Sequence, residues 1–109
     1  MGELLQRLQV WYVAQCNGEW EHDHGIAITS CDNPGWWVKI DIIGTGLEHR
    51  PFNRVAEQVD ASGFQQGNRW LSCFVNNGIW NGAGDETKLL VIVKTFLDWA
   101  DCENLSHEA

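Results

Sequence analysis

The sequence has no long hydrophobic run and little positive charge. No apolar segment approaches the ~20 residues that a membrane-spanning helix needs. The N-terminal stretch MGELLQRLQVWY also lacks the basic start and the apolar stretch of a secretion signal. Only 7 residues are basic against 15 acidic ones, which gives a formal net charge of −8. Such a surface repels nucleic acid and anionic membranes, so we expect a cytoplasmic protein that binds neither.

Paired cysteine motifs and catalytic signatures are also missing. The cysteines form no C-x-x-C pair and lie far apart, at Cys16, Cys31, Cys73 and Cys102. Without a secretion signal, this spacing favours four reduced and mostly buried thiols. The chain has no nucleophile elbow, no serine with a partnered histidine and no phosphate-binding loop. The sequence therefore predicts a protein that is not an enzyme and carries no cofactor.

Acidic residues and tryptophan are what the sequence has in abundance. Apolar residues make up 44% of the 109 positions, enough for one globular domain that spans residues 1–109. Seven tryptophans are more than a core of this size readily hides, so we expect one or two to be exposed. The acidic surface fits a basic protein partner, although acidity also simply keeps a protein soluble.

Apolar periodicity and turn signals divide the chain into helices and strands. Residues 3–16 carry an amphipathic helical stripe that ends at Asn17–Gly18, a pair suited to closing a helix. Strands are expected at residues 25–30, 36–43, 54–60 and 69–75, with a short one at 79–80. The fourth of these is apolar on both faces, which favours a central strand.

The C-terminal part predicts a turn followed by a helix. The glycine-rich NGAGDE, residues 81–86, is expected to form the turn, with Asp85 as the N-cap of the last helix. The complete order predicts an α+β fold. Its antiparallel sheet of four to five strands is flanked by an N-terminal and a C-terminal helix, and both helices pack on one face.

The turn at CDNPG sets the register of the first two strands. A two-residue loop would place Ile28 opposite Asp41. To bury Ile28 beside Ile40, the loop must hold an odd number of residues or a bulge must intervene. We predict one of these two arrangements, with Gly35 as the residue best suited to it.

The stretch GEWEHDHG, residues 18–25, gathers carboxylates and histidines around one tryptophan. Extended geometry places its ring side chains on one side and its acids on the other: Trp20, His22 and His24 against Glu19, Glu21 and Asp23. The two histidines could both contact a metal, but a zinc site needs three or four converging ligands. The distant candidates, His49, His107 and the cysteines, show no partner spacing. A solvated strand or turn is the plainer explanation, and a small metal-binding protein or metal-dependent enzyme using His22 and His24 is the alternative function.

Two of the tryptophans are candidates for partner binding because of their positions in the expected strands. Trp37 shares a strand face with Lys39 and Asp41, the side expected to meet solvent, and Trp80 lies near a loop. Exposed tryptophan is typical of binding hot spots, because a rigid ring gains contact area at little entropic cost. A second layer that covers both rings, such as a helix or a dimer mate, explains them equally well.

Three separated segments together resemble a known family. They are WYVAQCNGEWEHDHGIAI (residues 11–28), DNPGWWVKIDI (32–42) and NGAGDETKLLVIVKTFLDWA (81–100). In these segments the chain resembles the Imm53 family of bacterial immunity proteins. The resemblance covers nearly the whole chain and is weakest between about residues 48 and 69. The shared motif positions are Trp20, Glu21, His22, Asn33, Pro34, Gly35, Trp36, Gly82 and Gly84.

The resemblance implies a role in polymorphic toxin systems, in which an immunity protein neutralises a cognate toxin domain by binding it. Pro34 and the motif glycines are expected to serve the fold. The candidates for toxin binding combine the acidic stretch with the two outlying tryptophans: Glu19, Trp20, Glu21, His22, Asp23, Trp37, Asp41 and Trp80. Their carboxylates would meet a positively charged toxin surface. A homodimer formed through exposed tryptophans is the remaining possibility.

Overall fold

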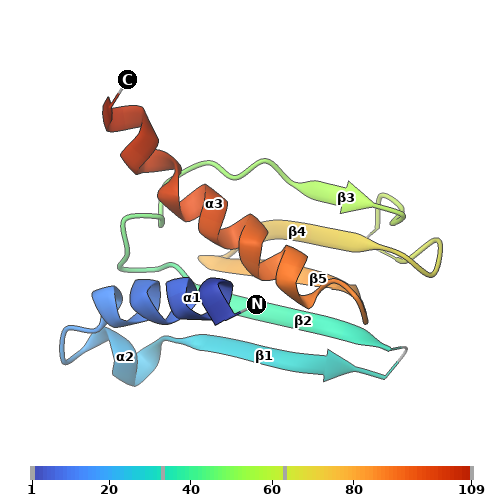
Figure 1. Ribbon diagram of the computed structural model, residues 1–109, viewed down its shortest axis with the longest axis horizontal. Helices are drawn as coiled ribbons and strands as arrows, with labels where there is room; N and C mark the ends of the chain where they lie inside the picture. Colours follow the sequence, from blue (N-terminus) through green and yellow to red (C-terminus); the bar gives the residue numbers. More distant parts are fainter. Residues whose placement is uncertain (1, 33, 63, 109) are drawn as a thin grey trace.

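A five-stranded antiparallel sheet forms one layer of the molecule, and two long helices form the other (Figure 1). The computed structural model describes residues 2–32, 34–62 and 64–108, with side chains as far as Asp101 in the last helix. The helices are α1 (Gly2–Gln15), α2 (Trp20–Asp23) and α3 (Leu89–Glu108). The strands are β1 (Ile26–Cys31), β2 (Gly35–Asp41), β3 (Val55–Glu57), β4 (Leu71–Asn76) and β5 (Ile79–Asp85). None of the described helices is long and apolar enough to cross a membrane.

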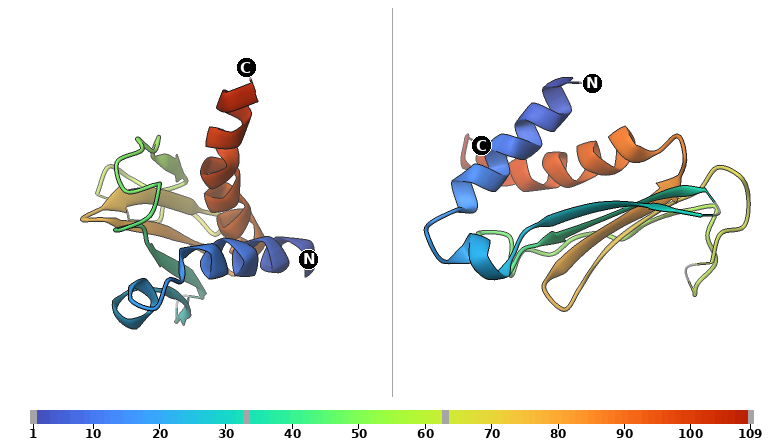
Figure 2. Two further views of the ribbon diagram at one scale, coloured as in Figure 1. Left: turned by 90° about the vertical axis from the view of Figure 1, so that its left-hand side faces the viewer. Right: turned by 90° about the horizontal axis from the view of Figure 1, so that it is seen from below.

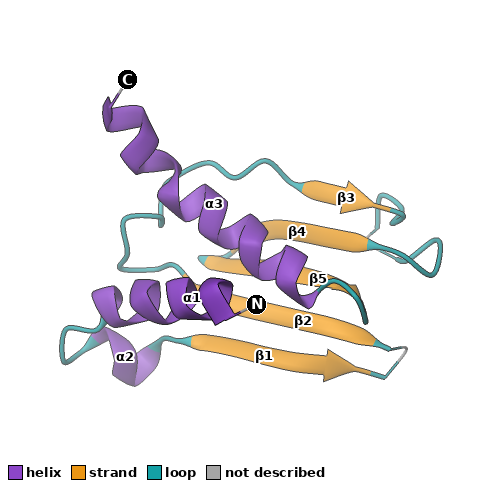
Figure 3. Ribbon diagram, in the orientation of Figure 1, coloured by secondary structure: helices purple, strands orange, loops and turns teal. Residues whose placement is uncertain are grey.

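The strands lie in the order β1-β2-β5-β4-β3, with every neighbouring pair antiparallel. Both α1 and α3 cover the same face of this sheet, and no described helix covers the other face (Figure 2). The predicted α+β fold, with the helices on one face, is therefore confirmed. The central strand is β5, whereas β4 has a neighbour on each side but lies one place off the middle. The connection through residues 42–54 runs as turns and loop (Figure 3).

Aromatic rings fill the core between the sheet and the helices. Trp80 and Phe96 are fully buried, and their ring centroids lie 5.2 Å apart. Trp11 from α1 meets Phe96 edge-on at 5.0 Å, and Phe52 meets Trp80 at 5.9 Å. Such edge-to-face pairs each add about 0.5–1.5 kcal/mol beyond the burial of their area. Trp37 is the one exposed member of the seven tryptophans, within the expected one or two.

The β1–β2 hairpin has an odd loop, which is one of the two arrangements predicted from the sequence. Cys31 pairs with Gly35, so residues 32–34 form the loop, of which Asn33 lies outside the described residues. In this register Ile28 lies opposite Val38, so the apolar residues of both strands share the helix-covered face. The loop alone supplies the required shift.

The glycine-rich segment expected to form a turn instead forms most of β5. A Cβ on Gly82 would lie 2.4 Å from Ile92 Cγ2 and 2.6 Å from an atom of the Trp80 ring. A Cβ on Gly35 would lie 2.4 Å from the carbonyl oxygen of Gly84. These glycines let the backbone approach its neighbours closely. The predictions of a short strand followed by a turn, and of Gly35 within the loop or a bulge, are therefore wrong.

Only one of the described thiols is buried. Cys73 in β4 has no exposed surface, and burial raises the pKa of its thiol to about 12, with a smaller contribution from the nearby charge of Glu57. Cys16 and Cys31 are free and partly exposed, so the expectation of mostly buried thiols is wrong for these two. The side chain of Cys102 lies outside the described residues.

Iodoacetamide is expected to alkylate Cys16 and Cys31 in the native protein and to spare Cys73. The thiolate is the reactive form, and Cys73 is both protonated and covered, so its reaction should be at least about a hundredfold slower. Peptide mass spectrometry after timed alkylation measures each site. Alkylation in urea is the control, in which Cys73 should react as readily as the others. Rapid labelling of Cys73 without denaturant would contradict its burial.

Candidate functional site

The acidic stretch after α1 folds as a capped helical turn. Asn17 Oδ1 accepts hydrogen bonds from the backbone N–H groups of Glu19 and Trp20, both at 2.9 Å. The Glu21 carboxylate accepts from the N–H groups of Asn17 at 2.9 Å and Gly18 at 2.8 Å. These bonds satisfy the backbone donors of residues 17–20, which lead into α2, much as capping side chains do at other helix starts. The prediction of an extended segment is therefore wrong, and so is the sorting of its acids and rings onto two sides.

Trp20 anchors this turn to the body of the protein. Its indole Nε1 donates to the backbone oxygen of Ile43 at 2.8 Å. Its ring packs near Trp11 at a centroid distance of 6.2 Å and near Tyr12 at 6.0 Å. Only 6% of Trp20 is exposed. This binding candidate therefore holds α2 in place and offers almost no surface to a partner.

The side chains that α2 turns toward solvent are mainly acidic. Glu19, His22 and Asp23 are exposed, and Glu21 is half-buried. Hydrogen bonds from backbone N–H groups, its own first and then those of the preceding turn, hold the pKa of Glu21 below its usual value. Glu21 is therefore occupied in closing the turn, whereas Glu19 and Asp23 project outward.

Asp41, at the end of β2, lies beside this turn. Its Oδ2 accepts the backbone N–H of Gly25 at 3.1 Å and lies 3.5 Å from Nδ1 of His24. The structure thus brings together five of the eight binding candidates. We call them the acidic corner: Glu19, Glu21, His22, Asp23 and Asp41.

The two histidines of this stretch occupy different environments. The ring of His24 lies 5.8 Å from that of Trp20 and beside Asp41, whereas His22 is exposed. Among the residues that the structure describes, no group of three or more histidine, cysteine or acidic side chains is placed to hold a metal ion. Within this part of the chain, His22 and His24 have no third ligand of the kind that zinc requires.

Besides Trp20, the two other tryptophan candidates lie in opposite environments. Trp37 is 41% exposed on the helix-free face of the sheet, and its Nε1 donates to Asn81 Oδ1 at 3.3 Å. Lys39 Nζ lies 4.5 Å from the centroid of the Trp37 ring, a cation–π distance. Trp37 also shares its strand face with Asp41, which links this surface to the acidic corner. Trp80 is fully buried under α3, so its ring has no surface to offer a partner.

Sequence reasoning missed a hollow on the helix-free face. This hollow has a volume of about 470 Å³, and its lining comes from β2, β4, β5 and the loop on either side of β3: Trp37, Arg54, Ala61, Ser62, Trp70, Ser72, Phe74 and Ala83. The loop between β3 and β4 turns toward this face (Figure 2). Only the alternation of Ser72 and Phe74 along one strand was visible in the sequence. The approach of residues 54–62 depends on the tertiary fold.

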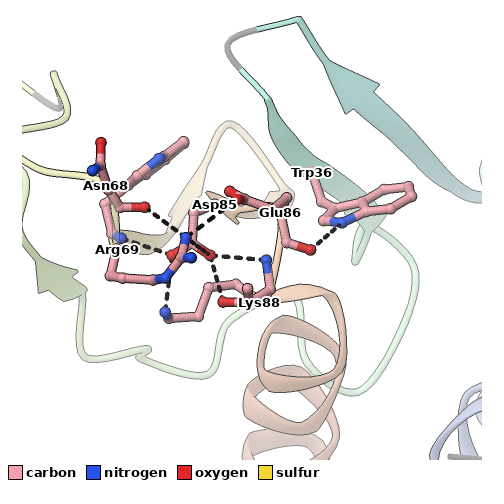
Figure 4. Close-up of polar contacts among 8 residues, drawn as sticks. Trp36, Asn68, Arg69, Asp85, Glu86 and Lys88 are labelled. Atoms are coloured by element: carbon pink, nitrogen blue, oxygen red, sulfur yellow. Dashed lines mark hydrogen bonds and ion pairs between the residues drawn. The ribbon is translucent and has the colours of Figure 1, made fainter.

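Asp85, the last residue of β5, has the most hydrogen bonds of any described carboxylate (Figure 4). It is 1% exposed. Its Oδ2 accepts the Trp70 N–H at 2.9 Å and lies 2.9 Å from Lys88 Nζ. Its Oδ1 accepts the Thr87 N–H at 2.8 Å and the Thr87 hydroxyl, and Arg69 Nη1 lies 3.5 Å away. The carboxylate therefore joins the start of β4, the end of β5 and the turn before α3.

Asp85 does not cap the last helix as predicted, because α3 begins four residues later, at Leu89. Burial by itself would raise the pKa of Asp85, but the bonds from Thr87, Lys88 and Trp70 outweigh it and hold that pKa well below its usual value. The adjacent turn is also tied to β2, since Trp36 Nε1 donates to the backbone oxygen of Glu86 at 3.1 Å (Figure 4). The carboxylate of Asp85, whose pKa is strongly lowered, thus has a structural role.

Residues 5–101 match the model of the Imm53 family, which is described as Immunity protein 53. The matched range holds the whole sheet, α2, most of α1 and the described side chains of α3. No curated protein and no solved structure matches the chain.

Proposed function

The chain belongs to the Imm53 family of immunity proteins, and on that basis we propose that it binds and neutralises a cognate toxin domain. The family match over residues 5–101 carries the proposal. The complex is stoichiometric, forms in the cytoplasm of the producing cell and covers the active site or the substrate path of the toxin. Neutralisation of this kind needs binding alone, so the chain performs no reaction of its own.

The charge of the protein supports a toxin with a basic surface. The formal net charge is −8, and the acidic corner presents the exposed carboxylates of Glu19 and Asp23. Opposite charge on two partners raises association rates by roughly 10–1000-fold. A standard interface covers about 800 Å² on each partner. The acidic corner is smaller than that, so we propose that the contact continues along β2 to the exposed ring of Trp37.

The direct test is co-expression with any toxin domain that a gene beside this one encodes. The proposal expects a complex with equal amounts of both proteins by size-exclusion chromatography with light scattering. It also expects toxin activity to fall in proportion to the immunity protein added, with an end point at one equivalent. Absence of a complex between the two purified proteins would overturn the proposal.

Charge reversal in the acidic corner is expected to slow toxin association. The double variant Glu19→Lys/Asp23→Lys changes two exposed carboxylates and spares Glu21, which closes the turn. We expect an association rate about tenfold lower at low salt and a much smaller difference at about 0.5 M salt, because salt screens exposed charges. Stopped-flow mixing measures both rates.

The matched control is Glu3→Lys/Glu57→Lys, which changes the net charge by the same amount. Glu3 lies at the far end of α1 and Glu57 on the opposite edge of the sheet, and both are exposed. If both double variants slow association equally, the effect comes from net charge and the acidic corner is not the contact.

A further inference from the structure

The two edges of the sheet are built differently. The β3 edge is three residues long, ends in Glu57 and is followed by Gln58 with a positive φ of 56°. Short length, charge and an abrupt turn are the features that keep edge strands from pairing with other chains. The β1 edge has none of them: its six residues, IAITSC, contain no charge and no proline. Four consecutive residues of β1, residues 27–30, are exposed.

Backbone groups of β1 point outward from the sheet. The Asp41 N–H donates to the Gly25 oxygen at 3.0 Å, so Gly25 and Asp41 form a hydrogen-bonded pair at the start of the β1–β2 ladder. Hydrogen-bonded pairs alternate with non-bonded pairs in an antiparallel ladder, so the odd-numbered residues of β1 bond to β2. The N–H and C=O groups of Ile26, Ile28 and Ser30 therefore face the outer side, where a further strand could pair with them.

An apolar groove runs beside these groups. It lies between α1 and the start of β1 and is lined by Leu5, Leu8, Gln9, Tyr12, Gly25 and Ile26. Leu5 is 45% exposed and Ile28 is 40% exposed, both on the helix-covered side of the sheet. A strand added to β1 would place every second side chain on this side, against these two residues.

We propose that an extended segment of the toxin adds to the sheet beside β1, as a strand that pairs with Ile26, Ile28 and Ser30. This inference rests on the proposed function and adds the β1 edge to the contact surface proposed there. Strand addition of this kind takes affinity from backbone hydrogen bonds and specificity from alternate side chains. The segment carries apolar side chains at alternate positions, facing Leu5 and Ile28.

The charges at the two ends of β1 indicate which residues the toxin segment carries at its own ends. Asp32 follows the C-terminal end of the strand, and Asp23 with the acidic corner precedes its N-terminal end; both residues are exposed. A strand with lysine or arginine at both ends complements these charges. In a centred antiparallel pair of two β1 strands, Asp32 of one copy would lie near Asp23 of the other, at both ends. A second copy of this acidic chain therefore fits the edge less well than a basic toxin segment.

Ser30→Pro tests this pairing, with Ser30→Ala as the matched control. Proline removes the outward N–H and places its ring against an incoming strand, but no bond to β2 is lost. We expect Ser30→Pro to weaken binding of the toxin domain encoded beside the gene by at least about tenfold, whereas Ser30→Ala, which keeps the N–H, binds as the unaltered protein does. Calorimetry measures both affinities, and circular dichroism checks that both variants fold.

Hydrogen exchange on the unaltered protein tests the same pairing without any substitution. The outward amides of Ile26, Ile28 and Ser30 should exchange at least about tenfold more slowly in the complex than in the free chain. If Ser30→Pro does not fold, Ile28→Lys takes its place, because an exposed lysine on the edge also opposes pairing.

The results of these experiments separate the proposed strand addition from the proposed function. Unchanged affinity of the edge variant together with unchanged exchange of these amides overturns the proposed strand addition, while a stable complex leaves the proposed function intact. A dimer of the chain alone that is lost in Ser30→Pro shows self-pairing and also overturns it. If the unaltered chain binds no toxin, the proposed function fails first.

Discussion

Asp85→Asn is expected to lower the free energy of unfolding by about 3 kcal/mol at neutral pH. The side chain is 1% exposed and its two oxygens accept from Trp70, Thr87 and Lys88. Asparagine removes the charge and turns one acceptor into a donor that faces other donors. Breaking a buried ion pair costs about 3–5 kcal/mol. We place this loss at the lower end because the partner side chain of Lys88 is 18% exposed and that of Arg69 58%.

Urea unfolding of the unaltered protein and the Asp85→Asn variant measures this difference. Repeating the measurement at several pH values separates the contribution of the Asp85 charge from that of its shape. The pKa of Asp85 is lowered on folding, so its contribution is fully present above the pKa of the unfolded chain, about 3.9, and is lost as pH falls through the folded value. The gap in stability between the unaltered protein and the Asp85→Asn variant should therefore be constant from about pH 5 to 7 and shrink below about pH 4. A gap that stays the same at about pH 3 would contradict a role for the charge.

The control for this substitution is Asp98→Asn on the exposed side of α3. Asp98 pairs with Lys94 and lies 3.7 Å from Arg7, but its side chain is 52% exposed. Exposed pairs contribute less than about 1 kcal/mol, so this variant should unfold nearly as the unaltered protein does. Equal losses at Asp85 and Asp98 would mean that burial of the Asp85 network is unimportant.

Gly82→Ala is expected to cost about 2–3 kcal/mol of unfolding free energy, the second largest effect. The new Cβ would lie 2.4 Å from Ile92 Cγ2 and 2.6 Å from the ring of Trp80, where all three residues are buried. Overpacking a dense core forces side chains and backbone to shift, at a typical cost of about 1–3 kcal/mol. Thermal and urea unfolding measure the change.

Gly46→Ala is the matched control for that substitution. Gly46 is exposed, and apart from Gly46 itself and its two chain neighbours no described atom lies within 4 Å of the place its Cβ would take. This variant should change stability by less than about 0.5 kcal/mol. If Gly82→Ala is equally mild, then Ile92 or Trp80 moves aside easily and the close approach of α3 to β5 is not required for stability.

The sequence predicts well those elements whose signals are local. The apolar stripe of α1 and the pair Asn17–Gly18 gave the first helix within one residue at each end, and Gly18 has a φ of 93°. The dipeptide Asn77–Gly78, between the strands expected at residues 69–75 and 79–80, is likewise a local turn signal, and both residues have the positive φ of a type I′ hairpin turn. Parity required either an odd β1–β2 loop or a bulge, and the structure has the odd loop.

The errors share one physical cause, which is dependence on distant residues. Gly82 and Gly84 resemble turn residues until the positions of Ile92 and Lys88 are known. The segment at residues 20–23 is helical because the Asn17 side chain accepts the N–H of Trp20 and the Glu21 carboxylate closes the turn before the helix, which no periodicity reveals. For the candidate site, the exposure of Glu19 and Asp23 was foreseeable from their polarity. The burial of Trp20 and Trp80 was not, because their packing partners come from other elements.

The capped turn at α2 has a consequence for how this protein could change its partner. Asn17, Trp20 and Glu21 are committed to the backbone of their own chain, so altering them would disturb folding first. Glu19 and Asp23, by contrast, project from the same turn into solvent. A lineage that faces a new toxin can therefore replace these outward residues one at a time while the scaffold beneath them stays intact.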